Sequence, residues 1–206
     1  MKVPSKEKAL EYLQFAKSSM MQLGVTSEMA NWYEMHCINV SKAAKVVAEK
    51  HNKANADTIE VMGLLHDIGK YEPEKIVKKH HAISGYEFML KEGYPDIANI
   101  CLTHIFPFKH FSKALYDLMF KNKSDIDFSK EYLTNTEYTA YDEIIQLVDM
   151  MSLANGFVTI EQRYDELVKR YGREDMRENQ PIYNRLKNKI DKEICHDVYT
   201  VLGIAS

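Results

Sequence analysis

Residues 60–70 of this chain read EVMGLLHDIGK, an apolar stretch that ends in an adjacent histidine and aspartate. Successive side chains of an α-helix point about 100° apart, so His66 and Asp67 cannot both reach solvent from a mostly buried helix. A buried carboxylate costs free energy unless a hydrogen bond, an ion pair or a metal ion satisfies it. We therefore expect other polar residues of the chain to meet this pair inside the fold.

The composition narrows the class of protein. The chain has 206 residues, of which 45% are hydrophobic and 28% charged, with a formal net charge of −3. These values predict a single globular domain over residues 1–206 and disfavour a nucleic-acid polymer as partner. Cys37, Cys101 and Cys195 are isolated, as is typical of reduced thiols in the cytoplasm. With no signal peptide and no spanning apolar run, we expect a cytoplasmic protein without a membrane partner.

The apolar residues recur with a period near 3.6, which predicts an all-α fold. We expect helices over residues 5–23, 26–52, 57–69, 80–92, 96–105, 112–121, 139–154, 159–172 and 181–202. Glu60 occupies the capping-box position of the helix that begins at Asp57. Residues 70–75 are expected to form a loop. The polar stretch at 121–137 is either a surface loop or a domain boundary, and its role stays open.

Metal-competent residues stand at positions where this periodicity predicts hydrophobic ones. His36, for example, falls in the apolar stripe that runs from Met29 and Trp32 to Val47. The complete set is His36, His66, Asp67, His81, His104 and Asp149. A single such histidine is more often a hydrogen-bonded core residue, but the set predicts a shared centre in a bundle core. Its ligand chemistry suits one or two divalent ions of Fe, Mn, Ni, Co or Zn, and leaves Mg open.

The order of these residues resembles a known family. His36, the HDIGK motif at 66–70 and Asp149 together resemble the HD superfamily of metal-dependent phosphohydrolases, over about residues 25–172. The resemblance implies an HD-type helical bundle around a buried metal site. It also implies that the N- and C-terminal helices pack on a core formed by residues 25–172.

A second motif resembles the additional ligands of HD members that hold two metals. It consists of His81-x-x-x-Gly85, followed by His104. The resemblance implies that His36, His66, Asp67 and Asp149 hold the first metal. It implies that His81 and His104 hold the second, with Asp67 bridging the two ions.

The chain departs from the branch of this family that hydrolyses cyclic dinucleotides. That branch carries paired histidines where this chain has His104-Ile105, followed by a Gly-Tyr-Pro signature. Here the letters GYP occur at 93–95, before His104. Cyclic dinucleotide hydrolysis is therefore disfavoured. His110 is either a further ligand or an exposed loop histidine.

Three residues are candidates for the chemistry. A bound metal lowers the pKa of its water towards about 7. Asp67 is a candidate because it is expected to bridge the ions that bind this water. Lys70 either contacts a substrate phosphate or interacts with the helix dipole. Arg163 either clamps phosphate or forms an ion pair with Asp165 or another nearby acid.

Substrate contacts are expected next to His104. The segment IFPFKHF at 105–111 offers Phe106 and Phe108, which either stack on a nucleobase or pack against the bundle. Other aromatic candidates are Tyr71 and Phe111. A basic group between the two motifs either guides phosphate or is a solvated loop: Lys75, Lys78 and Lys79.

These features predict an enzyme that hydrolyses a phosphate mono- or diester. We expect its substrate to be a nucleotide. One alternative is a symmetrical dinucleoside tetraphosphatase, although FVTIEQRYDEL at 157–167 does not match that group. A di-iron HD-type oxygenase, which would depend on O₂, and a non-catalytic nucleotide-sensing module are further alternatives. Ile182, Leu186, Ile190 and Ile194 either pack on the bundle or on a second subunit, so the protein is a monomer or a homodimer.

Overall fold

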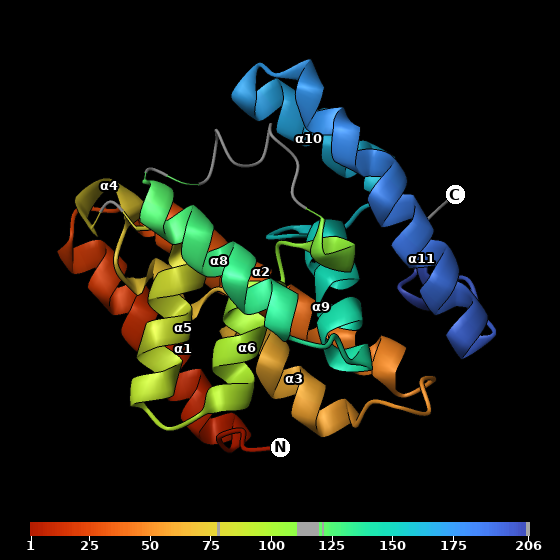
Figure 1. Cartoon of the computed structure of the whole chain (residues 1–206), viewed down its shortest axis with the longest axis horizontal. Helices are drawn as coiled ribbons and strands as arrows, with labels where there is room; N and C mark the ends of the chain where they lie inside the picture. Colours follow the sequence, from red (N-terminus) through yellow and green to blue (C-terminus); the bar gives the residue numbers. More distant parts are fainter. Residues whose placement is uncertain (78, 111–119, 121, 205–206) are drawn as a thin grey trace.

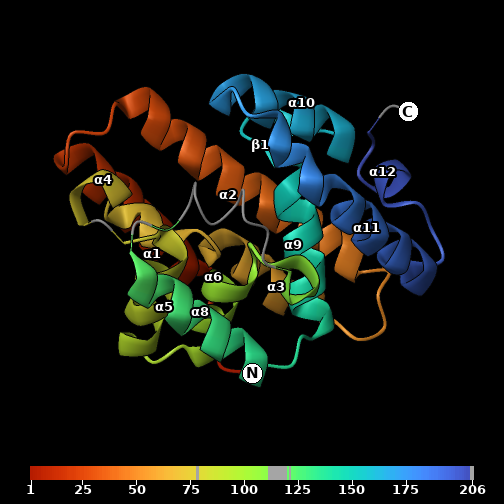
Figure 2. The ribbon, with the colours of Figure 1, turned by 45° about the horizontal axis from the view of Figure 1, so that its top comes forward.

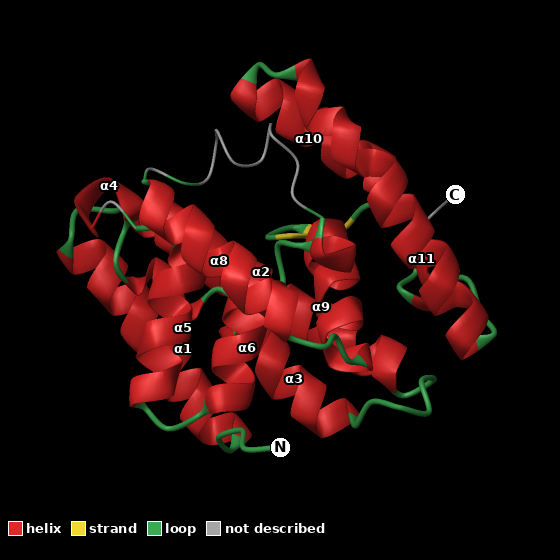
Figure 3. Ribbon diagram, viewed as in Figure 1, coloured by secondary structure: helices red, strands yellow, loops and turns green. Residues whose placement is uncertain are grey.

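The framework of the protein is helical (Figure 1, Figure 3). The computed structural model describes residues 1–77, 79–110, 120 and 122–204. The first half contains α1 (Lys6–Gln22), α2 (Ser27–Ala48), α3 (Ala56–Leu65), η1 (Ile68–Tyr71), α4 (Glu74–Val77), α5 (His81–Lys91), α6 (Pro95–Thr103) and η2 (Pro107–Lys109). The second half contains α8 (Lys123–Asn135), α9 (Ala140–Met151), α10 (Ile160–Tyr171), η3 (Glu174–Asn179), α11 (Gln180–Ile194) and α12 (Val198–Val201). The predicted all-α class is confirmed.

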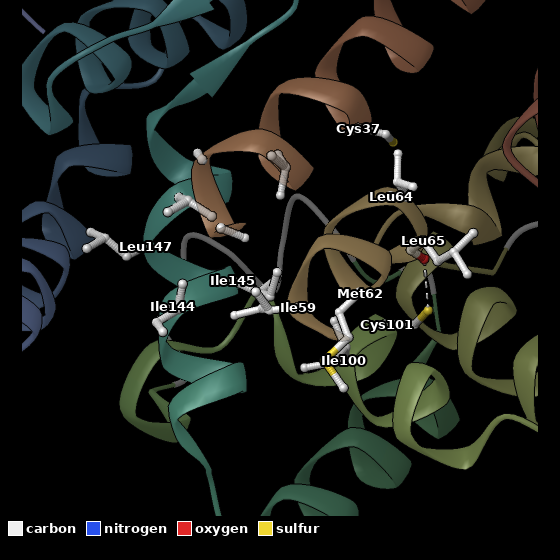
Figure 4. Close-up of a cluster of buried hydrophobic side chains, with 14 of the residues drawn as sticks. Cys37, Ile59, Met62, Leu64, Leu65, Ile100, Cys101, Ile144, Ile145 and Leu147 are labelled. Atoms are coloured by element: carbon white, nitrogen blue, oxygen red, sulfur yellow. Dashed lines mark hydrogen bonds between the residues drawn. The ribbon is translucent and has the colours of Figure 1, made fainter. Parts of the chain in front are cut away.

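The helices pack in a way that brings distant parts of the chain together. α2 lies against α3, α5 lies against α6, and α9 contacts α2, α3 and α6. α11 lies on the opposite side of the molecule from α1 in both views (Figure 1, Figure 2). The buried apolar side chains between these helices form one large cluster, which includes Ile59, Met62 and Ile145 (Figure 4). Burying each such side chain contributes roughly 1.5–3 kcal/mol.

A single short hairpin is the β structure of the described residues. β1 (Ser152–Leu153) pairs antiparallel with β2 (Gly156–Phe157), directly after α9. The expected helix 139–154 therefore ends at Met151. Asn39 of α2 holds the hairpin, because its side-chain amide donates to the carbonyl of Leu153 at 2.7 Å. The hairpin thus fixes the end of α9 against α2.

The apolar stripe of α2 was only partly predicted. Thr26 caps the helix as expected, and Tyr33, Val40 and Val47 are buried. Trp32 is 59% exposed, which contradicts its place in the stripe, and so is Met29. Adjacent residues point about 100° apart, so only one of the pair at 32 and 33 could face the core.

α3 begins and ends earlier than predicted. Its N-cap is Asn55, whose side chain accepts from the backbone N–H of Thr58 at 2.9 Å, so Glu60 is not a capping-box residue. Glu60 instead forms ion pairs with Lys6 at 2.6 Å and Lys45 at 2.9 Å. The α-helical turns stop at Leu65, and a tighter helix, η1, follows. The helix end therefore coincides with the adjacent histidine and aspartate.

Two glycines allow the segments around that helix end to approach each other closely. A Cβ atom on Gly69 would lie 1.9 Å from the carbonyl oxygen of His81 and 2.4 Å from the backbone nitrogen of Gly85. A Cβ atom on Gly85 would lie 3.1 Å from Cβ of Cys101. The glycines of the two motifs therefore set the spacing between η1, α5 and α6.

Two expected irregular segments are helical. Residues 70–75 include the end of η1 and the start of α4, and residues 123–135 form α8. Asn122 caps α8 by accepting from the backbone N–H of Asp125 at 2.8 Å. Leu133 of α8 joins a second, smaller cluster with Leu102 and Phe106. The expected helix at 112–121 lies almost entirely outside the described residues.

The expected last helix, 181–202, is two helices. α11 ends at Ile194, and Cys195 adopts a left-handed conformation with φ 55° before α12 begins. Leu186 and Ile190 of α11 are buried, and the helix contacts α9. The apolar stripe of this helix therefore packs on the bundle of its own chain. No helix in the described part of the chain combines the length and the apolar character needed to cross a membrane.

Candidate metal centre

The predicted metal-competent residues meet in one place. They come from different elements and are buried or largely buried. His36 lies on α2, His66 and Asp67 follow α3, His81 opens α5, His104 follows α6, and Asp149 lies near the end of α9. Most of them stand at helix ends, where the chain turns and a side chain can project between elements. The structure thus brings together all six residues that the sequence selected.

One group of these side chains surrounds Asp149. Nε2 of His36 lies 3.0 Å from Oδ1 of Asp149, and Nε2 of His66 lies 3.4 Å from the same oxygen. The two histidine nitrogens are 3.3 Å apart, and each lies 3.6 Å from Oδ2 of Asp67. Four potential ligand atoms thus converge from α2, from the two residues that follow α3 and from α9, as a mononuclear metal site requires.

A second group surrounds the other oxygen of Asp67. Nε2 of His81 lies 3.0 Å from Oδ1 of Asp67, and Nε2 of His104 lies 3.5 Å from it. Asp67 therefore turns one oxygen to each group. This arrangement fits a carboxylate that bridges two ions, and the donor set of imidazoles and carboxylates fits transition metals.

Backbone carbonyls fix the tautomer of three of these histidines. Nδ1 of His66 donates to the carbonyl of Gly63 at 2.8 Å, and Nδ1 of His104 donates to the carbonyl of Cys101 at 2.8 Å. Nδ1 of His36 lies 3.2 Å from the carbonyl of Ser152 in the β hairpin. A carbonyl can only accept, so Nδ1 carries a proton, and Nε2 is the nitrogen that can bind a metal once any proton on it is displaced. Metal-ligating histidines are held in this way.

The two carboxylates of the centre are ionised. Burial raises the pKa of Asp67, but the Lys70 ammonium and the His66 imidazole outweigh burial and hold that pKa well below its usual range. Burial also raises the pKa of Asp149, but hydrogen bonds from His36 and His66 outweigh burial and hold that pKa well below its usual range. The carboxylates therefore present negative charge to any cation that enters.

The histidines respond in different directions. Burial lowers the pKa of His66 and of His81, but the Asp67 carboxylate outweighs burial and raises both pKa values. The pKa of His104 is lowered, mainly by burial. A metal ion that binds to this centre must therefore displace protons from His66 and His81.

Lys70 lies at the centre, as expected. Its ammonium pairs with Oδ2 of Asp67, and its side chain is 38% exposed. Burial lowers the pKa of Lys70, while the Asp67 carboxylate outweighs burial and raises it, so the group is a permanent cation. Lys70 therefore forms a direct ion pair with Asp67, in addition to any interaction with the helix dipole, which was the alternative interpretation.

Arg163 forms the ion pair that was its alternative interpretation. Its Nη1 atom lies 2.6 Å from Oε2 of Glu166, whereas Asp165 pairs with Arg177. Arg163 is mostly buried, and its Nε atom has no hydrogen-bond partner in the described part of the structure. The acid that it binds is therefore Glu166 rather than Asp165.

The residues next to His104 separate into core and surface. Phe106 is 1% exposed and packs in the second core cluster, which matches the alternative that it packs against the bundle. Phe108 has φ 52°, and the guanidinium of Arg185 lies 4.1 Å from its ring centroid. His110 is exposed and belongs to none of the clustered groups of potential ligands, which matches the loop-histidine alternative.

The remaining candidates for substrate contacts either pair with residues away from the centre or lie outside the described residues. Lys79 pairs with Glu87 at 2.7 Å, and Tyr71 packs between Phe15 and Phe88. Lys78, Phe111 and the side chain of Lys75 lie outside the described part of the structure. The proposed basic group therefore has only one member whose contacts are known.

Two residues at the centre were missed by the sequence analysis. Glu74 and His80 form a third group of potential ligands together with His81. Glu74 lies in the segment that was expected to be a loop, seven residues before His81. The histidine pair at 80–81 was the available signal, because a polar residue next to a buried histidine needs its own partner.

Comparison with known proteins gives one match. The model of the HD domain family matches residues 33–153, more than half of the chain, and this range includes all six clustered residues. No curated protein and no solved structure matches the chain.

Proposed function

The chain belongs to the HD domain family, and from this premise we propose that it hydrolyses a phosphate mono- or diester of a nucleotide with a metal-activated water. The observation that carries the proposal is the position of Asp67. Its Oδ1 atom lies 3.0 Å from Nε2 of His81, and its Oδ2 atom lies 3.6 Å from Nε2 of His36. A buried carboxylate can be stabilised by one or two hydrogen bonds, so the four imidazoles around Asp67 point to metal binding rather than to a purely structural role.

The residues of the chain divide the work in a simple way. We propose that the first ion is held by His36, His66, Asp67 and Asp149, and the second by Asp67, His81 and His104. Bound ions of this kind lower the pKa of water and offset charge on phosphoryl oxygens. Lys70 is a cation that contacts the centre among the described residues, and we propose that its partly exposed ammonium turns from Asp67 to a phosphate oxygen when substrate enters.

A small pocket beside the centre supports a nucleotide as substrate. Ile105 and Met150, which directly follow His104 and Asp149, line it together with Tyr164 and Tyr183. Its wall is mainly apolar and aromatic, with His110 and Asn179 as polar members, which suits the face and the polar edge of a base.

The volume of this pocket, about 40 Å³, admits only a few water molecules. A base would enter only if side chains repack, and Met150 and Met176 are the unbranched wall residues that can do so. We propose that this repacking, and not Phe106, selects the substrate.

Three other functions share the same centre. A di-iron oxygenase would use both metal positions, and the bridging geometry of Asp67 favours it as the second candidate. A symmetrical dinucleoside tetraphosphatase would differ only in substrate. A nucleotide-sensing module would bind metal and nucleotide without turnover.

The experiment that tests the proposal is a substrate panel with defined metals. Metal-free protein would be reloaded with Mn²⁺, Co²⁺ or Fe²⁺ and assayed with nucleoside monophosphates, phosphodiesters and a dinucleoside tetraphosphate. We expect phosphate or nucleotide release that requires metal and proceeds equally with and without air. Turnover of a non-phosphate substrate only in air, or binding without turnover, would contradict the proposal.

A further inference from the structure

Glu74 makes a concentrated set of contacts at the edge of the centre. Its Oε1 atom accepts from the backbone N–H of His81 at 3.1 Å and lies 2.8 Å from Nδ1 of the same residue. The same oxygen lies 3.5 Å from Nε2 of His80. Glu74 opens α4 and His80 caps α5, so one carboxylate oxygen joins the two helices.

These contacts fit two different roles. Glu74, His80 and His81 are close enough to bind a further metal ion of their own. Alternatively, Glu74 orients His81 for an ion on the other side of the ring. The positions of the ring protons separate the two roles.

The proton of His80 is placed by its cap contact. Nδ1 of His80 accepts from the backbone N–H of Ala82 at 3.2 Å, so this nitrogen carries no proton. The proton of the neutral ring is then on Nε2, which faces Glu74. His80 therefore offers Glu74 a donor and has no lone pair left for a metal.

The ring of His81 lies between two carboxylates. Nδ1 faces Glu74 and must donate, because a carboxylate only accepts. Nε2 faces Oδ1 of Asp67 at 3.0 Å, which is the position of the proposed second ion. The contact with Glu74 therefore leaves Nε2 as the nitrogen that can give up its proton to a metal.

We propose that Glu74 is a positioning residue that fixes the Nδ1-protonated tautomer and the ring orientation of His81, and so completes the second metal position. The inference rests on the proposed metal centre and deepens it. A carboxylate behind a ligating histidine also makes that histidine a stronger donor, and losing such a partner typically weakens metal binding about 10- to 100-fold.

Metal titration of full-length variants tests this role. Wild type, E74Q, E74A, H80N and E87Q would be freed of metal and titrated with Zn²⁺ against a competing chelator. H80N keeps a side chain that caps helices well. E87Q is the matched control, because Glu87 is an exposed residue of α5 that pairs with Lys79 and touches none of the clustered residues in the described contacts.

We expect E74A to weaken the second Zn²⁺ about 10- to 100-fold, E74Q to weaken it less, and neither to change the first. H80N and E87Q should keep two ions per chain. NMR of ¹⁵N-histidine in the Zn²⁺-loaded protein should show the Nδ1-protonated tautomer for His81 in wild type and a mixture of tautomers or orientations in E74A.

Two results would overturn the inference. One is an unchanged second affinity together with an unchanged His81 tautomer in E74A. The other is a third equivalent of Zn²⁺ that is lost in H80N, since that would make the cluster a metal site of its own. Failure of the proposed hydrolysis would look different: wild type would still bind two ions with the expected tautomer but release no phosphate.

Discussion

Oδ1 of Asp67 lies 3.0 Å from Nε2 of His81, while the other oxygen of the same carboxylate faces His36 of α2 and His66, the residue after α3. A single side chain therefore belongs to both groups of potential ligands. It can do so because α3 ends one residue before His66 and the chain tightens into η1, which turns Asp67 between the two groups. Any change to Asp67 should affect both metal positions at once.

The substitution D67N tests this dependence. It keeps the shape of the side chain but removes the negative charge, so we expect loss of both ions and a fall in kcat/KM of more than about 100-fold, beyond the effect of losing a ligand's partner. Metal content and phosphate release would be measured on the same preparation. D57N is the matched control, because Asp57 is 86% exposed in its side chain and pairs only with Lys45 among its described contacts. Loss of only one ion in D67N would argue against the bridge.

Lys70 gives a prediction that separates substrate binding from metal binding. We expect K70Q to keep its metal content and to lower kcat/KM about 10- to 100-fold, the value of one hydrogen bond to a charged group. K79Q, which removes a lysine paired with Glu87 on the surface, should leave both quantities unchanged. An active K70Q enzyme with altered metal content would instead make Lys70 a counter-charge for Asp67.

The pKa shifts predict how metal affinity depends on pH. The pKa values of His66 and His81 are raised above the ordinary value of 6.5, because the Asp67 carboxylate outweighs burial. Protons therefore compete with metal below these raised pKa values, and there affinity should rise with pH, by about tenfold per pH unit for each proton displaced. Chelator competition at pH 6, 7 and 8 would measure the slope. An affinity that does not change over this range would contradict the assignment of these histidines as ligands.

Gly69 is predicted to be a packing requirement of the HDIGK motif. The Cβ atom of G69A would collide with the backbone of His81 and Gly85, so we expect a loss of about 2–3 kcal/mol in the free energy of unfolding. Urea denaturation of metal-free protein would measure it. G24A is the comparison, because a Cβ atom there meets nothing within 4 Å and only the positive φ opposes it. Equal losses in the two variants would show that close packing is not the cause.

Much of the helical framework could be predicted because its signals are local. Thr26 and the pair Thr159–Gln162 cap α2 and α10 as their sequences indicate, since the donors and acceptors lie within three residues of each other. α8 was missed because it has few apolar residues. Its helix is held partly by burial of Leu133 in a cluster contributed by other elements, which the segment's own sequence does not reveal.

The residues of the candidate centre could be selected from the sequence by their type and position. The contacts of the residues around them could be predicted only in part. Histidines and aspartates on apolar faces stand out because burial without a partner is costly, and His36 and Asp149 were found in this way. Glu74 was missed because its contact with His81 depends on the relative position of α4 and α5, which the sequence does not show. The two alternatives for Phe106 could not be separated from the sequence, because the packing around its ring depends on α5 and α8, which are distant in sequence.

Metal content measured on protein purified without chelator and without nickel affinity tests the central claim most directly. Wild type would be compared with the double variant H81A/H104A by elemental analysis. The account predicts about two ions per chain in wild type and about one in the double variant. An equal content of one ion in both proteins would contradict a dinuclear centre, and would leave His81 and His104 as core or substrate-contacting residues.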